Sequence, residues 1–211
     1  MNFIGFYDYT VILTYLSLIS SLAGMCFAVA GRPGVAMACL ALSGICDLFD
    51  GTVARTKKGR TEDEKSFGIQ LDSMCDVVCF GVFPAVFLYF SGVDGVGGFL
   101  LLSFYVLCAV IRLAFFNVLE AKRQAANSGS NKSFRGLPVT TAAMVFPAVF
   151  LLGLLLPRDV CLLIYHVLPA VMGFLFILDV RVPKLDVSGL IRRAPDQEKS
   201  AEHQPVCHKQ E

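Results

Sequence analysis

Four aspartates in two short segments are the residues of this sequence best suited to chemistry. Asp47 and Asp50 are three residues apart, and Asp72 and Asp76 are four apart. On a helix either spacing places both carboxylates on one face, about one turn apart. Apolar sequence surrounds each pair, and a carboxylate in such surroundings is costly and usually functional. The spacing therefore predicts two helices that each present a pair of acids.

Four carboxylates that face one another repel unless they are protonated or neutralised, and a pair of divalent cations is the simplest neutraliser. Ligands that are all oxygen favour Mg²⁺ or Mn²⁺, with Ca²⁺ as an alternative. Two such ions about 4 Å apart suit phosphoryl chemistry, because they neutralise the phosphate and the charge that develops on the attacking and leaving oxygens. After the first pair, the small residues Gly51 and Ala54 would let a ligand approach the backbone, and Arg55 could pair with a phosphate.

The composition places these acids in a membrane protein. Of the 211 residues, 55% are hydrophobic and 17% are charged, and the mean hydropathy is +0.65. The net charge of +1 argues against a nucleic-acid binder. Because a span takes roughly 20 apolar residues, the chain has room for about six or seven spans. The prediction is an all-α bundle of six transmembrane helices, at 11–30, 34–54, 69–91, 96–118, 138–156 and 160–178.

The basic residues give this bundle an orientation. Most of the 18 Lys and Arg residues fall in 55–67, in 121–136 or after residue 180, whereas Arg32 and Arg158 lie in the opposite connections. The positive-inside rule therefore predicts a multi-pass protein of the cell membrane with both termini in the cytoplasm. Residues 1–186 are predicted to form one transmembrane catalytic domain, and 187–211 a polar, disordered cytoplasmic tail.

The pattern D-x-x-D-G-x-x-A-R followed by G-x-x-x-D-x-x-x-D resembles the signature of the CDP-alcohol phosphatidyltransferase family. All its fixed positions are present, at Asp47, Asp50, Gly51, Ala54, Arg55, Gly68, Asp72 and Asp76. The resemblance implies six transmembrane helices, a homodimer, a site open to the cytoplasm, and displacement of CMP from a CDP-linked lipid by an alcohol hydroxyl. The connection 56–67 is longer than is usual in the family, at a place where insertions cost little.

The resemblance also implies a role for each matched position. The metal ligands would be Asp47, Asp50, Asp72 and Asp76. Asp76 would in addition act as the catalytic base that accepts the proton of the incoming hydroxyl. The cytidine diphosphate part of the lipid would be held by Gly51, Ala54 and Arg55.

Within the family, the sequence is most similar to membrane-embedded phosphatidylserine synthases. The stretches that carry this similarity are 71–73 with 80–85, 112–117 and 134–138. One departure is Phe115, which stands where those enzymes commonly have arginine. The similarity implies CDP-diacylglycerol and L-serine as substrates, giving phosphatidylserine and CMP within phospholipid biosynthesis.

The acceptor has further candidate contacts in Arg112, Asn117 and Lys132. Arg112 lies deep in a predicted span, where binding a lipid phosphate or substrate carboxylate and pairing structurally with an acid are about equally good explanations. Glycerol phosphate, inositol phosphate or another alcohol stays open as the acceptor. From other classes, the alternatives are a cation transporter that uses the four acids as an ion path and a lipid-binding scaffold with a degenerate site.

Overall fold

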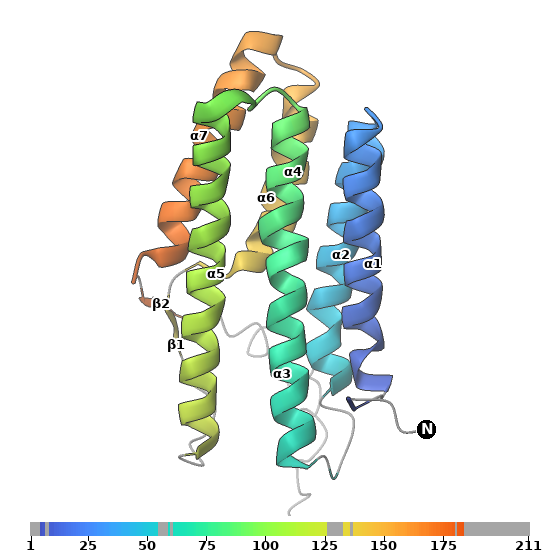
Figure 1. Ribbon diagram of the computed structural model, residues 1–211, viewed down its shortest axis with the longest axis vertical. Coiled ribbons are helices and arrows are strands. Elements are labelled where there is room, and N and C mark those ends of the chain that lie inside the picture. The colour runs from blue at the N-terminus through green and yellow to red at the C-terminus, as the bar shows by residue number, and fades with distance from the viewer. Residues whose placement is uncertain are drawn as a thin grey trace, which may run out of the picture.

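The computed structural model describes residues 5–6, 9–54, 59, 61–125, 133–135, 137–179 and 181–183. These residues form a bundle of long helices that run side by side (Figure 1). A 3₁₀ turn, Tyr9–Val11, leads into α1, Ile12–Val29, and α2 follows at Pro33–Ala54. The first two helices pack chiefly against each other.

The third rod of the bundle joins three helical segments without a break. These are α3, Glu62–Asp76, a π-helical turn, Val77–Val82, and α4, Phe83–Phe90. The rod lies between the α1–α2 pair and α5, and it contacts both sides (Figure 1). The rod therefore connects the two sides of the bundle.

The rod begins earlier than the predicted boundary at 69. The Thr61 hydroxyl accepts a hydrogen bond from the Glu64 backbone N–H at 3.2 Å, and the Glu64 carboxylate accepts one from the Thr61 N–H at 2.9 Å. This capping box satisfies two amide groups at the helix end, and the acidic first turn complements the helix dipole. The prediction that all of 55–67 is a connection was thus wrong for the residues from Glu62 onward.

The π turn has a clear local cause in Pro84. Proline has no N–H to donate and its ring crowds the carbonyl four residues earlier, so the Phe80 carbonyl cannot take the usual helical hydrogen bond from residue 84. The buried Tyr105 hydroxyl donates to that carbonyl instead, at 2.6 Å. The wider turn and the Tyr105 bond together keep the rod continuous directly after Asp76.

The second half of the chain forms α5, Gly95–Ala125, then a 3₁₀ turn, Val139–Thr141, with α6, Ala142–Gly153, and finally α7, Arg158–Ile177. Helix α5 packs mainly on α7, and α6 packs on α2. Gly44 of α2 is needed for that second contact, because a Cβ on it would collide with the Ala143 side chain.

Two three-residue strands are a small departure from the all-helical prediction. Strand β1, Ser133–Arg135, pairs antiparallel with β2, Arg181–Pro183, with Phe134 opposite Val182. Just after β1, the Leu137 N–H donates to the Leu175 carbonyl near the end of α7 at 3.5 Å. These contacts tie the sequence before α6 to the end of α7.

The membrane class and the helical-bundle fold are confirmed. Within the described residues, five helical rods are long and apolar enough to cross a bilayer: α1, α2, the α3–α4 rod, α5 and α7. The sixth predicted span, 138–156, holds a shorter helix than expected, since the 3₁₀ turn and α6 together run from Val139 to Gly153 and rise about 24 Å against roughly 30 Å of hydrocarbon. Pro138 and Pro157 stand close outside its two ends. The predicted tail, 187–211, lies outside the described residues.

Candidate metal centre

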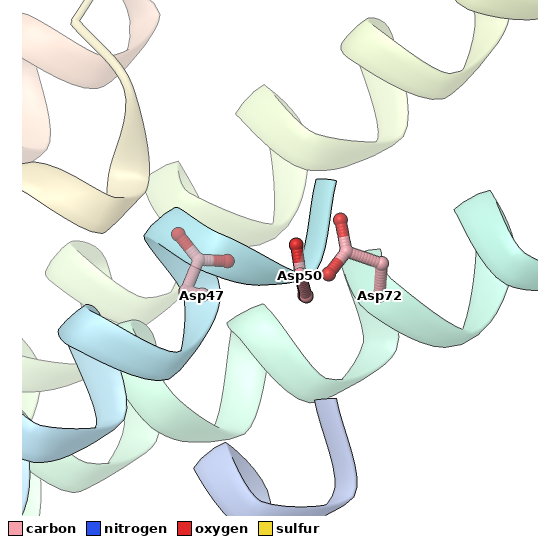
Figure 2. A group of neighbouring side chains, drawn as sticks. All are labelled: Asp47, Asp50 and Asp72. Atoms are coloured by element: carbon pink, nitrogen blue, oxygen red, sulfur yellow. The ribbon is translucent and has the colours of Figure 1, made fainter. Parts of the chain in front are cut away.

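Three of the four predicted acids form one compact group. Asp47 and Asp50 extend from α2, and Asp72 extends from α3 toward Asp50 (Figure 2). One carboxylate oxygen from each residue lies within 4.8 Å of the others, and all three side chains are partly buried. The two helices thus present their acids to each other, as the spacing predicts.

Asp76 lies beside this group rather than within it. It is the last residue of α3, is only 8% exposed, and interacts with the carboxyl groups of Asp47 and Asp72. A buried carboxyl group next to the cluster, directly before the π turn, is shielded from bulk water. The structure therefore separates a cluster of three acids from one deeper acid.

The surroundings of the acids fit a cation. The Asp72 Oδ1 atom is buried and has no hydrogen-bond partner. Among the residues that the structure describes, no Lys or Arg side chain forms an ion pair with any of the four aspartates. Buried carboxylates without a counter-charge are costly, so a donor set made only of oxygen with an unused buried atom suits Mg²⁺ or Mn²⁺.

Helix α1 supplies a residue that the sequence reasoning missed. The Thr14 hydroxyl, which is 6% exposed, donates to Asp50 Oδ2 at 3.2 Å. Further along the same helix, Ser17 and Ser21 hydrogen-bond to the Ser43 hydroxyl of α2, at 2.7 Å and 2.9 Å. Hydroxyls at 14, 17 and 21 share one helical face, which is a signal that could have been found, and bonds of this kind hold membrane helices together.

The structure describes two of the three residues predicted to hold the nucleotide. Gly51 lies on α2 next to Asp50, is exposed, and has no heavy atom within 4 Å of the position a Cβ would take. Ala54 is the last residue of α2. Arg55 lies outside the described residues. Open space at Gly51 is compatible with a ligand lying against the helix.

Asn117, a predicted acceptor contact, joins α5 to α3 instead of standing free. Its Oδ1 accepts a hydrogen bond from the Ser73 hydroxyl at 2.7 Å, and its Nδ2 donates to Gln70 Oε1 at 3.3 Å. The amide thus fixes α5 against the residue that follows Asp72. Lys132, the other candidate on a connection, falls outside the described part of the chain.

Arg112 is buried without an acidic partner in the described structure. It is 9% exposed, its Nε atom has no hydrogen-bond partner, and its guanidinium carbon lies 5.8 Å from the centre of the Phe116 ring. The structural ion pair that the sequence left open is therefore not seen within the described residues. The guanidinium keeps donors for a ligand.

Comparison with known proteins connects this site to a family. The profile described as CDP-alcohol phosphatidyltransferase matches residues 9–178. Archaetidylserine synthase of Methanothermobacter thermautotrophicus is 31% identical over 179 residues, which cover 84% of this chain and 70% of that protein.

Two CDP-diacylglycerol–serine O-phosphatidyltransferases are also similar to the chain. The protein of Saccharomyces cerevisiae is 41% identical over 107 residues, covering 49% of this chain and 37% of that protein. The protein of Methanocaldococcus jannaschii is 36% identical over 143 residues, covering 68% of this chain and 61% of that protein. The chain therefore spans less than two thirds of either of these two relatives.

Proposed function

Because the chain belongs to the CDP-alcohol phosphatidyltransferase family, we propose that it transfers a phosphatidyl group from CDP-diacylglycerol to the hydroxyl of L-serine. The products are phosphatidylserine and CMP. The observation that carries the proposal is the group of carboxylates from Asp47, Asp50 and Asp72, whose oxygens lie within 4.8 Å of one another on the segments that bear the family signature. The names of the three relatives support serine as the acceptor.

The acids are proposed to hold two divalent cations, Mg²⁺ or Mn²⁺, with Ca²⁺ as an alternative. The ligands are Asp47, Asp50, Asp72 and Asp76. When bound, such ions neutralise the phosphates and stabilise the charge that develops on the attacking and leaving oxygens. The unpartnered Asp72 oxygen and the lack of a described basic partner support this assignment.

Asp76 is proposed as the base. Its carboxylate accepts the proton of the serine hydroxyl while the serine oxygen forms a bond to the phosphorus that carries the diacylglycerol. The bond from that phosphorus to the oxygen it shares with CMP breaks, and CMP leaves with the bonding electrons. The position of Asp76 beside the three-acid group, and its low exposure of 8%, support a role distinct from that of its neighbours.

The helix that carries the first pair of acids is proposed to bind the nucleotide as well. Gly51 and Ala54 allow the cytidine diphosphate part to lie against α2, and Arg55 pairs with a phosphate. The space around Gly51 supports the first part of this assignment. A phosphate held there lies next to Asp50, which brings it to the metal site.

We propose that the site faces the cytoplasmic side of the cell membrane, since most basic residues of the sequence fall in 55–67, in 121–136 or after residue 180, which the positive-inside rule assigns to the cytoplasm. The protein is proposed to act as a homodimer among membrane lipids, as family members do. Serine and CMP then enter and leave from the cytoplasm, while the lipid substrate and product stay in the bilayer.

The proposal is tested with the full chain, purified and returned to lipid nanodiscs that contain CDP-diacylglycerol. CMP release and the lipid product are measured with L-serine, glycerol 3-phosphate, inositol phosphate or no acceptor, with Mg²⁺ or Mn²⁺ and with a chelator. Serine is expected to give phosphatidylserine and CMP in equal amounts, and only with metal. Absence of CMP release with every acceptor would refute the proposed function, and cation flux by the same protein in sealed proteoliposomes would favour the transporter.

The base is tested with Asp76→Asn, for which turnover is expected to fall by about 10²–10⁴ while the protein still folds. Asp94→Asn is the matched control, because Asp94 is exposed in the connection before α5. Substantial turnover by Asp76→Asn would move the role of base to another residue.

A further inference from the structure

A hollow lies beside α5 at the end of α7. It has a volume of about 230 Å³ and is lined by Ile111, Arg112, Phe115 and residues 176–179. Its walls are apolar apart from Arg112 and Asp179, which carry opposite charges. Because Arg112 is 9% exposed and its Nε atom is buried without a partner, an anion in the hollow would complete its hydrogen bonding.

Arg112 lies between two points at which α5 touches the α3–α4 rod. A Cβ added to Gly81 would lie 3.5 Å from the Cβ of Ala109, so these two residues pack closely. Toward the other end of α5, Asn117 accepts the hydrogen bond from Ser73 at 2.7 Å. Arg112 is therefore level with the stretch of the rod between these contacts, which is the last turn of α3 and the start of the π turn.

That stretch of the rod contains Asp76, so the hollow is at the level of the proposed base. The stretch 112–117 lines the hollow through Arg112 and Phe115. Leu137, just after β1, donates a hydrogen bond to the Leu175 carbonyl near the end of α7, one residue before the α7 part of the lining.

The pair of charges decides which acceptor chemistry fits. A phosphorylated alcohol would bring two negative charges beside Asp179, which would repel them. An alcohol without charge would leave the buried guanidinium unsatisfied. A zwitterion matches both groups, because a guanidinium binds a carboxylate in two parallel hydrogen bonds and a carboxylate attracts an ammonium group.

We propose that this hollow binds the α-amino-acid end of the acceptor, with Arg112 holding its carboxylate and Asp179 its ammonium group. This assignment rests on the proposed function and makes it more specific. Arg112 and Asp179 then fix two ends of serine, and its hydroxyl is left to point toward the rod.

The test compares three acceptors in nanodiscs with CDP-diacylglycerol and Mn²⁺: L-serine, ethanolamine, which lacks the carboxylate, and 3-hydroxypropanoate, which lacks the ammonium group. Arg112→Gln is expected to raise the KM for L-serine at least about tenfold and to reduce the preference for serine over ethanolamine by a similar factor. Asp179→Asn is expected to reduce the preference for serine over 3-hydroxypropanoate, also about tenfold. The KM for CDP-diacylglycerol is expected to stay within about twofold of wild type.

The matched controls are Arg158→Gln and Asp159→Asn, which remove the same charges at the exposed opposite end of α7. Neither is expected to change the preference among acceptors. A merely structural Arg112 would lower activity with all acceptors alike and leave the ratios unchanged, which would overturn the assignment. A raised KM for CDP-diacylglycerol with unchanged ratios would identify a lipid phosphate as the anion and also overturn it.

Asp179→Asn keeps the test decisive if Arg112→Gln does not fold, because Asp179 is exposed at the end of a helix. An unchanged preference in that variant would overturn the assignment by itself. Failure of the proposed function is distinct, since the wild-type protein would then release no CMP with serine.

Discussion

The two sides of the bundle hold buried charged side chains of opposite sign. On the side of α1, α2 and α3, four aspartates are gathered with a threonine and a row of serines between the helices. On the side of α5 and α7, one buried arginine stands in an apolar hollow with one acid at its rim. The first arrangement suits cations and phosphate, and the second suits a small zwitterion. The α3–α4 rod, which carries Asp72 and Asp76, contacts both sides.

The difference shows how a membrane enzyme can use one region for a reaction that suits many acceptors and a second region to select one acceptor. In the proposed function, the acid side supplies what any displacement of CMP requires, which is charge neutralisation and a base. In the proposed binding of the acceptor, the arginine side supplies only recognition. A change on one side should therefore alter catalysis, while a change on the other should alter the choice of acceptor.

The largest expected effect comes from removing a carboxylate of the three-acid group. Asp72→Asn should lower CMP release with every acceptor at least about a hundredfold, because one stabilising group for the developing charge is lost. The measurement is the rate of CMP release in nanodiscs at a metal concentration that saturates the wild-type protein. An equal loss of CMP release with all acceptors would support separate regions for catalysis and for acceptor choice. A loss confined to serine would contradict that separation.

Thr14→Val should act on the same side with a smaller effect. Loss of the hydroxyl that orients Asp50 is expected to weaken Mn²⁺ affinity about 10- to 100-fold, because groups that orient metal ligands typically have effects of that size. Mn²⁺ binding to the substrate-free protein, followed by electron paramagnetic resonance, measures it directly.

Thr14→Ser should restore the affinity, since it keeps the donor. Ser20→Ala is the matched control, because Ser20 lies on the same helix but donates to the Cys39 carbonyl, away from the acids. Unchanged Mn²⁺ affinity in Thr14→Val would show that the Thr14 hydroxyl does not contribute to metal binding.

Tyr105→Phe should weaken the contact between α5 and the α3–α4 rod. The Phe80 carbonyl loses its buried donor, which is expected to lower the free energy of unfolding by about 1–3 kcal/mol. Thermal unfolding in detergent measures the change, with Tyr89→Phe as the control on the exposed end of α4. An equal midpoint for both variants would show that the Tyr105 bond contributes nothing to stability.

The smallest effect is expected at the start of α3. Thr61→Ala removes the capping box and should destabilise the helix end by about 1 kcal/mol, with turnover changed less than about twofold. Thr61→Ser should behave as wild type. A large loss of turnover in Thr61→Ala would mean that the helix start positions the acids, which lie more than two turns away.

The acid side could be predicted from the sequence because it depends on residues that are close together in the chain. Asp47 with Asp50, and Asp72 with Asp76, are each set by spacing on one helix, and membrane helices are visible in hydropathy. The start of α3 also has a local signal, since Thr61 and Glu64 form a capping box, but the charged residues around it predict a connection instead. The short α6 was missed because apolar sequence continues past the turn that ends it.

The arginine side could be predicted only in part. Arg112 stood out as a buried cation, but Asp179 has no local pattern that connects it to Arg112. Their places in the lining of one hollow depend on how α5 packs against α7 and on where α7 ends. Asn117 shows the same limit, because its bonds to Ser73 and Gln70 follow from the approach of two helices distant in sequence.

The most direct test of the division is a Mn²⁺ titration of the substrate-free protein, followed by electron paramagnetic resonance, for wild type, Asp72→Asn and Arg112→Gln. The account predicts that Asp72→Asn loses Mn²⁺ binding and that Arg112→Gln keeps the wild-type affinity. Full binding by Asp72→Asn, or loss of binding in a folded Arg112→Gln, would contradict it.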